Sequence, residues 1–296
     1  MERKKQIIPI PTDSLWACCH LPSRALDANK GSFGRTLLLV GSPKYIGAAH
    51  LAAEAALRSG VGYVGYLGES KLCAELRARF PELLFYEKEA YPGGVSSFSG
   101  IFSGFSSILT GCGSDISEEY LDTLEQLITS EGAPLILDAD AINTLARHSS
   151  SDIFSKKRRT VILTPHPLEL SRISGLSVDE IASDRVGVAR ALAAEWGVIL
   201  LLKGRGTVIT DGSTVYVNTS GSTALAKAGS GDVLAGLVAG LVAYSPSPLE
   251  AVALAAYLHG RAGDTLGESL SEYGVTPSDL PCQIGREICK LRGGEG

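Results

Sequence analysis

Residues 228–236 read AGSGDVLAG, and this stretch decides the fold class because a glycine-rich turn runs directly into an apolar helix of small side chains. Gly229 and Gly231 allow the backbone to adopt positive φ and to approach a ligand closely. The free N–H groups of the first helical turn, together with the helix dipole, form an anion site that needs no net basic charge. The stretch therefore predicts a helix that begins at a bound phosphate.

Asp232 in this stretch has two interpretations. Aspartate is a favoured N-cap residue, so Asp232 could simply cap the helix. It could also act as a general base, accepting the proton of a substrate hydroxyl while that oxygen attacks a phosphoryl group held by the same amides. Phosphoryl transfer depends mostly on positioning and charge neutralisation, and four residues here supply a base and an anion site. Spacing alone favours the N-cap interpretation.

Outward from this stretch, short apolar runs alternate with helical patterns. The alternation indicates a mostly parallel central sheet with helices on both faces, and turn signals at residues 204–206 and 211–212 add a small antiparallel edge. We find no linker or repeat, so residues 1–296 are predicted to be a single α/β domain with residues 1–23 as an N-terminal extension. Strands are expected at residues 36–40, 63–67, 107–110, 135–138, 161–164, 198–202, 207–210 and 214–217, and helices at 48–59, 116–129, 140–147, 178–195, 232–244, 249–266 and 277–291.

Composition narrows the function classes. Of 296 residues, 45% are apolar, which suits a sizeable core, and the net charge of −5 argues against non-specific binding to nucleic acid or an anionic membrane. The six cysteines form no CxxC pair and no zinc-type spacing, so they are interpreted as reduced thiols, and no residue is assigned as a metal ligand. The N-terminus lacks the apolar segment of a signal peptide, and residues 233–244 are too short to cross a bilayer, so a cytoplasmic protein is expected.

One apparent motif does not fit its context. Residues 60–65 read GVGYVG and match the dinucleotide fingerprint GxGxxG. That fingerprint requires a strand that ends where a helix begins, whereas here a helix ends and a strand follows. Gly60 is therefore predicted to be a left-handed residue at the end of a helix. The sequence also contains no GxxxxGK[ST] phosphate loop.

Small and polar residues follow several predicted strands, where an open α/β sheet binds its ligands. Residues 218–236 resemble the phosphate-site motif of ribokinase-like small-molecule kinases, whose equivalent aspartate is the catalytic base. The wider ordered set is similar to the ADP- or ATP-dependent NAD(P)H-hydrate dehydratase family over roughly residues 24–292. That set is KGSFGR (30–35), GSPKYIGAA (41–49), GCG (111–113), DADAIN (138–143), TPHPLE (164–169), KGRGT (203–207) and GSGD (229–232).

The resemblance implies an enzyme that dehydrates (6S)-NAD(P)H hydrate, known as NADHX or NADPHX, with ADP or ATP as phosphoryl donor and Mg²⁺ as cofactor. It also implies a homo-oligomer, expected to be a tetramer, that works with a separate NAD(P)H-hydrate epimerase. Asp232 would be the catalytic base and would also contact the substrate. The remaining implied contacts are Ala48, Gly113, Asn143 and His166 for the substrate, and Lys203, Gly204, Arg205, Gly206, Thr207, Gly229, Ser230 and Gly231 for the nucleotide.

Alternatives remain for several of these residues. Lys203 could be a solvated lysine at a strand end, His166 could belong to a rigid turn between two prolines, and Asp138 could cap the following helix. The chain also departs from the family pattern at Leu168, where a loop glycine is usual, and at Ser222, where an asparagine is usual. The rival activity is that of a ribokinase-like vitamin kinase, such as hydroxyethylthiazole or pyridoxal kinase.

Overall fold

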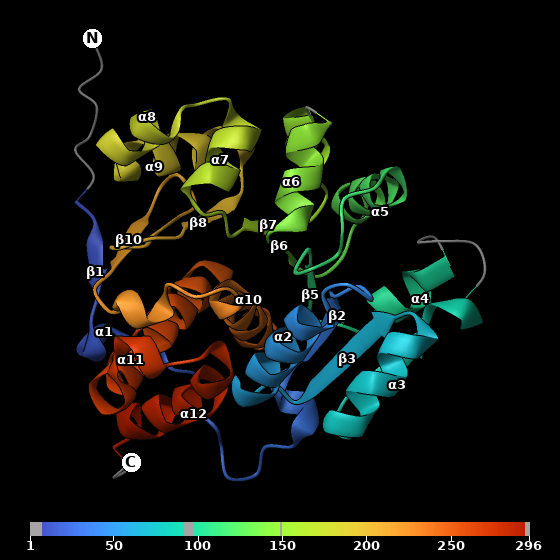
Figure 1. Cartoon of the computed structure of the whole chain (residues 1–296), viewed down its shortest axis with the longest axis horizontal. Coiled ribbons are helices and arrows are strands. Elements are labelled where there is room, and N and C mark those ends of the chain that lie inside the picture. The colour runs from blue at the N-terminus through green and yellow to red at the C-terminus, as the bar shows by residue number, and fades with distance from the viewer. Residues whose placement is uncertain (1–7, 92–96, 149, 294–296) are drawn as a thin grey trace.

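The computed structural model describes residues 8–91, 97–148 and 150–293, and its centre is a single sheet (Figure 1). Within these residues the sheet has ten strands in the order β1-β10-β9-β8-β7-β6-β5-β2-β3-β4. Every neighbouring pair is parallel except the two that involve β9. The strands are β1 (Ile10–Thr12), β2 (Arg35–Leu39), β3 (Tyr63–Gly68), β4 (Leu84–Glu87), β5 (Ser107–Thr110), β6 (Leu135–Leu137), β7 (Val161–Leu163), β8 (Ile199–Leu202), β9 (Val208–Thr210) and β10 (Val215–Asn218).

The strand order changes direction between β2 and β5. From β2 the chain runs outward through β3 to β4, whereas from β5 it runs the other way through β6 and β7 to β8. The crevice at the carboxyl ends of two such strands is the usual ligand site of an open α/β sheet, because the loops there diverge to opposite faces. The topology therefore places the expected site beyond β2 and β5.

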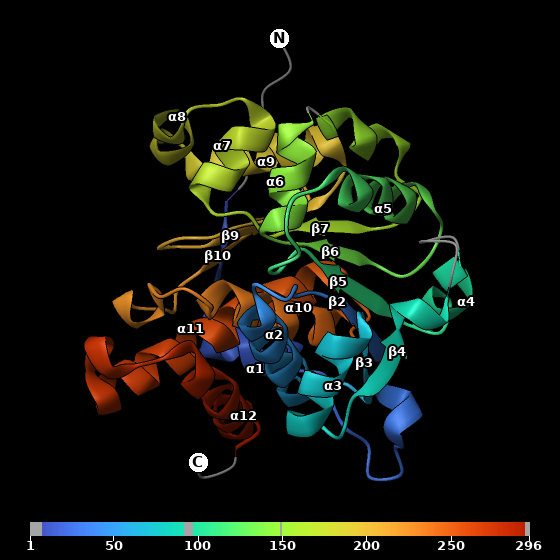
Figure 2. The same cartoon turned by 45° about the vertical axis from the view of Figure 1, so that its right-hand side comes forward.

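Helices cover both faces of the sheet (Figure 2). Apolar side chains on the two sides form two separate cores, one on each face. Since both faces are covered, the central strands are almost wholly buried, as parallel strands require. The first face carries α1 (Ser14–His20), α2 (Ile46–Arg58), α3 (Ser70–Arg79), α10 (Ser230–Val242), α11 (Pro248–Gly274) and α12 (Leu280–Leu291), and the second α4 (Ser99–Phe102), α5 (Glu118–Thr129), α6 (Asp140–Arg147), α7 (Pro167–Ser174), α8 (Val178–Ser183) and α9 (Arg185–Trp196).

The predicted fold class is confirmed, including the antiparallel edge formed by β9 between β8 and β10. Gly60 has φ +93° just after α2, as predicted for the end of a helix that precedes a strand. The helix expected over residues 178–195 is instead two helices, because Asp184 has extended φ and its carboxylate accepts the Gly187 N–H to start α9.

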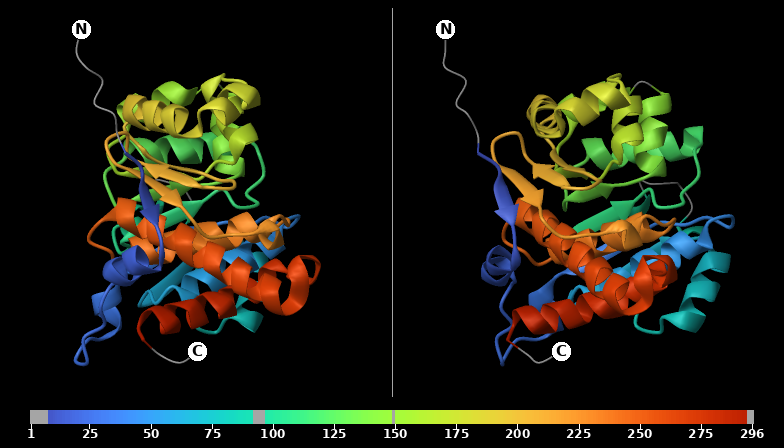
Figure 3. Two further views of the ribbon diagram at one scale, coloured as in Figure 1. Left: turned by 90° about the vertical axis from the view of Figure 1, so that its left-hand side faces the viewer. Right: turned by 60° about the vertical axis from the view of Figure 1, so that its left-hand side comes forward.

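Several elements were not predicted from the sequence. The segment proposed as an N-terminal extension contributes β1, which pairs with β10 at the edge of the sheet (Figure 3). Strand β4 at the opposite edge and helices α1, α3, α4 and α7 were also missed. Edge strands and short surface helices bury few side chains, so their apolar pattern is weak. Among the described residues, no helix is long and apolar enough to cross a membrane.

Candidate active site

Helix α10 begins at the carboxyl edge of the sheet with a glycine turn and no side-chain cap. Gly229 precedes the helix with φ +99°, a conformation that only glycine adopts readily. Because no side chain caps this end, the first-turn amides remain available to an anion. Asp232 lies in the first turn but makes no cap hydrogen bond, so the interpretation of Asp232 as an N-cap is wrong.

Asp232 borders a pocket of about 470 Å³. Two predicted substrate contacts, Ala48 and Gly113, line the same pocket together with the predicted phosphate residue Gly229. Gly113 has φ +62°, and a Cβ there would lie 2.7 Å from the Tyr45 Cβ and 3.0 Å from the Ala48 Cβ, so the pocket wall is tightly packed at this point. The other lining residues are Lys44, Tyr45, Gly47, Leu51, Asp140 and Ala228.

The Asp232 carboxyl group has an elevated proton affinity. Burial, reinforced by the neighbouring Asp138 carboxylate, raises its pKa to about 6, while a hydrogen bond from Cys112 and the charge of Lys203 oppose the shift. A general base works best with a pKa close to the pH at which it operates, because it must be ionised and still attract a proton. Asp232 meets this requirement near neutral pH.

This pKa gives a pH prediction. Asp232 must be ionised to accept a proton, so kcat/KM is expected to be level above about pH 7 and to fall about tenfold per unit well below pH 6. Initial rates between pH 5 and 8 would give the profile. A rate that stays constant from pH 8 down to pH 5 would exclude Asp232 as the base.

Lys203, at the end of β8, lies in a buried ion pair. Its Nζ is 2.8 Å from Asp138 Oδ1 and 3.9 Å from Glu169 Oε2. Burial acts to lower the pKa of Lys203, but these two carboxylates outweigh it and raise the pKa, so the ammonium stays charged. The interpretation of Lys203 as a solvated lysine is therefore wrong. A Cβ on Gly231 would lie 3.5 Å from Lys203 Nζ, which places this cation beside the start of α10.

Asp138 lies at the centre of this network, whereas the sequence suggested for it a cap of the following helix. The Thr164 hydroxyl donates to Asp138 Oδ1 at 2.7 Å, and the Cys112 thiol donates to Oδ2 at 3.6 Å. Helix α6 has Ala139 as its N-cap residue with no side-chain cap, so Asp138 does not cap it. The sequence signals for this role were the position of Asp138 directly after a buried strand and its place in the DADAIN segment.

The Cys112 thiol is fully buried, and burial raises its pKa well above the usual range. Alkylation requires an accessible thiolate. Iodoacetamide is therefore expected to label the exposed Cys18, Cys19, Cys282 and Cys289 in the native protein and to leave the buried Cys73 and Cys112 unmodified. Mass spectrometry of native and denatured samples would measure the difference, and labelling of Cys112 in the folded protein would contradict its burial.

Ser230, predicted to contact the nucleotide, is hydrogen-bonded to His259, a residue for which the sequence predicted no role in the site. His259 of α11 places Nε2 3.0 Å from the Ser230 carbonyl oxygen and 3.2 Å from its hydroxyl. Burial lowers the pKa of His259 to about 4, so the ring is neutral. A carbonyl oxygen can only accept, so Nε2 carries the proton and donates to it. This contact fixes the first residue of α10.

His166 has a structural contact that accounts for its position between two prolines. Its Nδ1 accepts the N–H groups of Leu168 and Glu169, and Glu169 Oε2 accepts the His166 N–H at 2.8 Å, so the pair forms a capping box at the start of α7. His166 is not among the residues that line the Asp232 pocket, so its substrate contact stays a prediction. Leu168, which stands where the family usually has a loop glycine, is 46% exposed, so its larger side chain is accommodated at the surface.

The remaining predicted residues lie around this centre. The loop after β8 turns at Gly204 and Gly206, both with positive φ, and the Thr207 hydroxyl donates to the Gly204 carbonyl; Arg205 is exposed at its tip. None of these four lines the Asp232 pocket. Asn143 lines an adjacent pocket instead, where its Oδ1 accepts from Arg172 at 2.8 Å.

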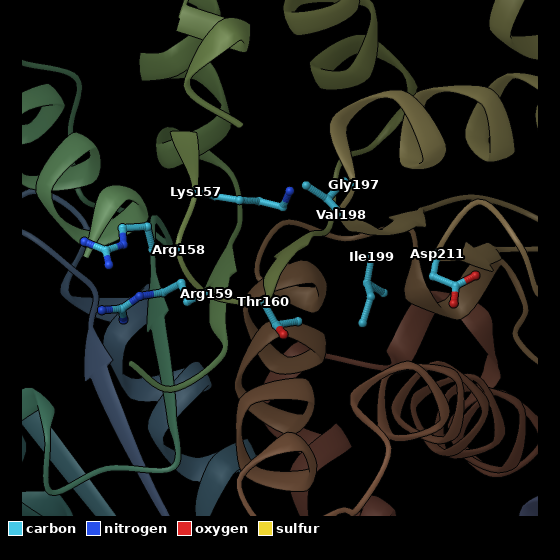
Figure 4. Close-up of a pocket in the computed structure, with 8 residues that line it drawn as sticks. All are labelled: Lys157, Arg158, Arg159, Thr160, Gly197, Val198, Ile199 and Asp211. Atoms are coloured by element: carbon cyan, nitrogen blue, oxygen red, sulfur yellow. The ribbon is translucent and has the colours of Figure 1, made fainter. Parts of the chain in front are cut away.

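A third pocket, of about 550 Å³, lies at the amino ends of β7 and β8, away from this site (Figure 4). It contains three basic residues, but two are already engaged. Arg159 donates to the backbone carbonyls of Ser130, Glu131 and Ala133, and Arg158 pairs with the Glu131 carboxylate. This pocket contains no predicted site residue.

Two features define a ribokinase-like protein. They are the order of the strands in the sheet and the uncapped helix α10, which begins at the carboxyl edge of the sheet and has Asp232 in its first turn. The family model described as NAD(P)H-hydrate dehydratase matches residues 36–287, and the chain belongs to this family. The resemblance inferred from the ordered motifs is thereby confirmed.

Individual relatives agree with this assignment. The chain is 34% identical to the ADP-dependent (S)-NAD(P)H-hydrate dehydratase of Neisseria meningitidis over 83% of this chain and 82% of that protein. It is 35% identical to the bifunctional NAD(P)H-hydrate repair enzyme of Moorella thermoacetica over 90% of this chain and 51% of that protein, so it spans about half the length of such relatives.

Solved structures point the same way. The ADP/ATP-dependent NAD(P)H-hydrate dehydratase of Bacillus subtilis, co-crystallised with ATP and Mg²⁺, superposes with a TM-score of 0.85 at 29% identity and covers 97% of this chain and 99% of that chain. A hydroxyethylthiazole kinase from Pyrococcus horikoshii, at 15% identity and a TM-score of 0.60, shares the fold alone.

Proposed function

We propose that this chain dehydrates (6S)-NAD(P)H hydrate back to NAD(P)H with ADP or ATP as the phosphoryl donor. The observation that carries the proposal is Asp232, a carboxyl group with a pKa of about 6 in the first turn of an uncapped helix, facing a pocket. Family membership supplies the substrate class. The N. meningitidis relative is named for ADP, and the B. subtilis enzyme for ADP or ATP.

In the first step, Asp232 accepts the proton of the C6 hydroxyl while that oxygen attacks the terminal phosphoryl group of the nucleotide. The amides at the start of α10 and the Lys203 ammonium stabilise the negative charge on that group. The oxygen–phosphorus bond that forms replaces the one to the leaving nucleotide, which departs as AMP from ADP or as ADP from ATP.

In the second step, the C6 phosphate leaves, driven by the lone pair of the ring nitrogen. Loss of a C5 proton then restores the double bond of the dihydronicotinamide ring. The products are NAD(P)H, inorganic phosphate, the shortened nucleotide and a proton. Phosphorylation converts hydroxide, a poor leaving group, into phosphate, a good one.

The donor set near Asp232 suits Mg²⁺ only in part. Ligand atoms of Cys112, Asp138 and Asp232 lie within 4.8 Å of one another. Magnesium prefers oxygen ligands, so the two carboxylates fit it whereas the protonated thiol does not. Lys203 already neutralises one oxygen of Asp138. When bound, Mg²⁺ would neutralise charge on the nucleotide phosphates, and the Asp138 carboxylate would be the group that holds it, since Asp232 must stay free to accept the substrate proton.

Several broader proposals accompany this function. We infer a single catalytic domain in a cytoplasmic homo-oligomer, with a tetramer favoured. An NAD(P)H-hydrate epimerase would supply the S form of the substrate, which agrees with the bifunctional names of some relatives. His166 and Asn143 remain proposed substrate contacts, and Lys203, Gly204, Arg205, Gly206 and Thr207 remain proposed nucleotide contacts.

Product analysis separates this function from that of a vitamin kinase. Incubation with NADHX, Mg²⁺ and ADP or ATP is expected to release one inorganic phosphate per NADH formed. ³¹P NMR would measure the phosphate. A kinase would instead leave a stable phosphate ester on hydroxyethylthiazole or pyridoxal. Accumulation of such an ester, with no inorganic phosphate from NADHX, would contradict the proposal.

A further inference from the structure

A second pocket, of about 400 Å³, lies next to the Asp232 pocket along helix α6. Asp140 at the start of α6 lines the Asp232 pocket, whereas Asn143, Ala146 and Arg147 further along the same helix line the second one. At 1.5 Å per residue, Asn143 is about 5 Å and Arg147 about 10 Å along the helix from Asp140. The two pockets are therefore within the reach of one elongated ligand.

The second pocket contains two guanidinium groups that no acidic side chain neutralises. It is lined by Arg147 from α6 and Arg172 from α7. Among the described residues, no carboxylate forms an ion pair with either arginine. The nearby helix α5 contributes Glu118, but Glu118 pairs with His148. Two uncompensated arginines facing one pocket make an attractive site for an anion.

Arg172 is also held in place. Its Nη1 donates to Asn143 Oδ1 at 2.8 Å, which joins α7 to α6. Within the described part of the chain, the other guanidinium N–H groups of Arg172 have no acceptor. After burial and Lys203, the Arg172 charge also contributes to the lowered pKa of His166, so Arg172 lies near that ring. The apolar side chains of Ile116 and Ala146 complete the lining. The pocket thus combines an exposed cation oriented by one hydrogen bond, a second exposed cation and two apolar side chains.

We propose that Arg147 and Arg172 bind a phosphate group of the dinucleotide substrate while its hydrated nicotinamide ring occupies the Asp232 pocket. This inference rests on the proposed function. A chain with net charge −5 must bind a multiply charged anion through local features, either backbone amides or a few placed cations. Guanidinium forks match phosphate oxygens in geometry. The phosphate could be the pyrophosphate bridge, which NADHX and NADPHX share, or the 2′-phosphate of NADPHX alone.

Steady-state kinetics of R147Q, R172Q and the double variant would test the proposal. Loss of charge-assisted hydrogen bonds is expected to raise the KM for the hydrate at least about tenfold in the double variant, with kcat and the KM for ADP or ATP within about twofold of wild type. An equal rise for NADHX and NADPHX identifies the pyrophosphate, and a rise for NADPHX alone identifies the 2′-phosphate. R158Q, at the other end of the sheet, is the matched control and should leave all constants unchanged.

The proposal is overturned if the double variant keeps its KM for both hydrates, or if only the KM for the nucleotide rises. Titration of NADH and NADPH binding by protein fluorescence separates this result from failure of the proposed function. If wild type binds these dinucleotides without turning over the hydrate, and the double variant binds them at least about tenfold more weakly, the subsite stands while the proposed activity fails. Equal binding by wild type and the double variant would overturn the subsite.

Discussion

Replacement of Asp232 by Asn is expected to lower kcat for nucleotide-dependent dehydration of NADHX by at least about 100-fold, since a positioned general base contributes that much or more. The amide has nearly the same size as the carboxyl group but cannot accept the proton. The N–H groups at the start of α10 are unchanged, so the nucleotide should still bind. Turnover under saturating ADP or ATP and nucleotide affinity by calorimetry would measure the two effects separately.

The stability of this variant provides the control. The folded pKa of Asp232, about 6, lies above the unfolded value of 3.8. An acid with a raised folded pKa destabilises the folded state as pH rises from its unfolded pKa through its folded pKa, and this cost is fully present at pH 8. D232N removes it, so thermal unfolding at pH 8 should occur at no lower temperature than for wild type. A variant that is stable and nearly fully active would exclude Asp232 as the base.

Replacement of Lys203 by Met is expected to destabilise the protein by about 3 kcal/mol or more, because it leaves a buried carboxylate without its cation. Asp138 is only 1% exposed and lies 2.8 Å from Lys203 Nζ, and Thr164 and Cys112 are weaker, neutral donors. Denaturant unfolding at pH 8 would measure the loss. K71M, at an exposed lysine on α3, should change stability by less than about 0.5 kcal/mol.

The double variant D138N/K203M tests the cause of this loss. If the cost comes from an unpaired buried charge, removal of the Asp138 charge should restore part of the stability lost in K203M. A double variant less stable than K203M by the full effect of D138N alone would show that the two residues act independently. That result would contradict the ion pair as the source of the effect.

The sequence was sufficient for the parts of the site that depend on local chain chemistry. The glycine turn at Gly229 predicted the start of α10 because positive φ and an uncapped first turn are local properties. The GxGxxG match at residues 60–65 was rejected from the helix-to-strand order alone, and Gly60 has the predicted left-handed conformation. Ala48 and Gly113 line one pocket with Asp232, and the substrate contacts that the ordered motifs implied for them stay predictions.

The sequence was insufficient where a residue acts through a partner far away in the chain. Asp138 and Lys203 are 65 residues apart, and only the adjacency of β6, β7 and β8 brings them together. His259 hydrogen-bonds to Ser230 from helix α11. The apolar pattern of that helix predicts only that the helix is buried, and does not predict this contact. Spacing likewise could not show that Asn143 lines the second pocket and holds Arg172. Such pairs depend on the tertiary fold, which local propensity does not encode.

The most direct test of the proposed function is absorbance at 340 nm after the protein is mixed with NADHX, Mg²⁺ and either ADP or ATP. If Asp232 is the base of a nucleotide-dependent dehydratase, absorbance is expected to rise only when a nucleotide is present, to rise faster with the preferred phosphoryl donor, and not to rise with D232N. Folded protein that binds either nucleotide yet produces no rise with both would contradict the dehydratase function.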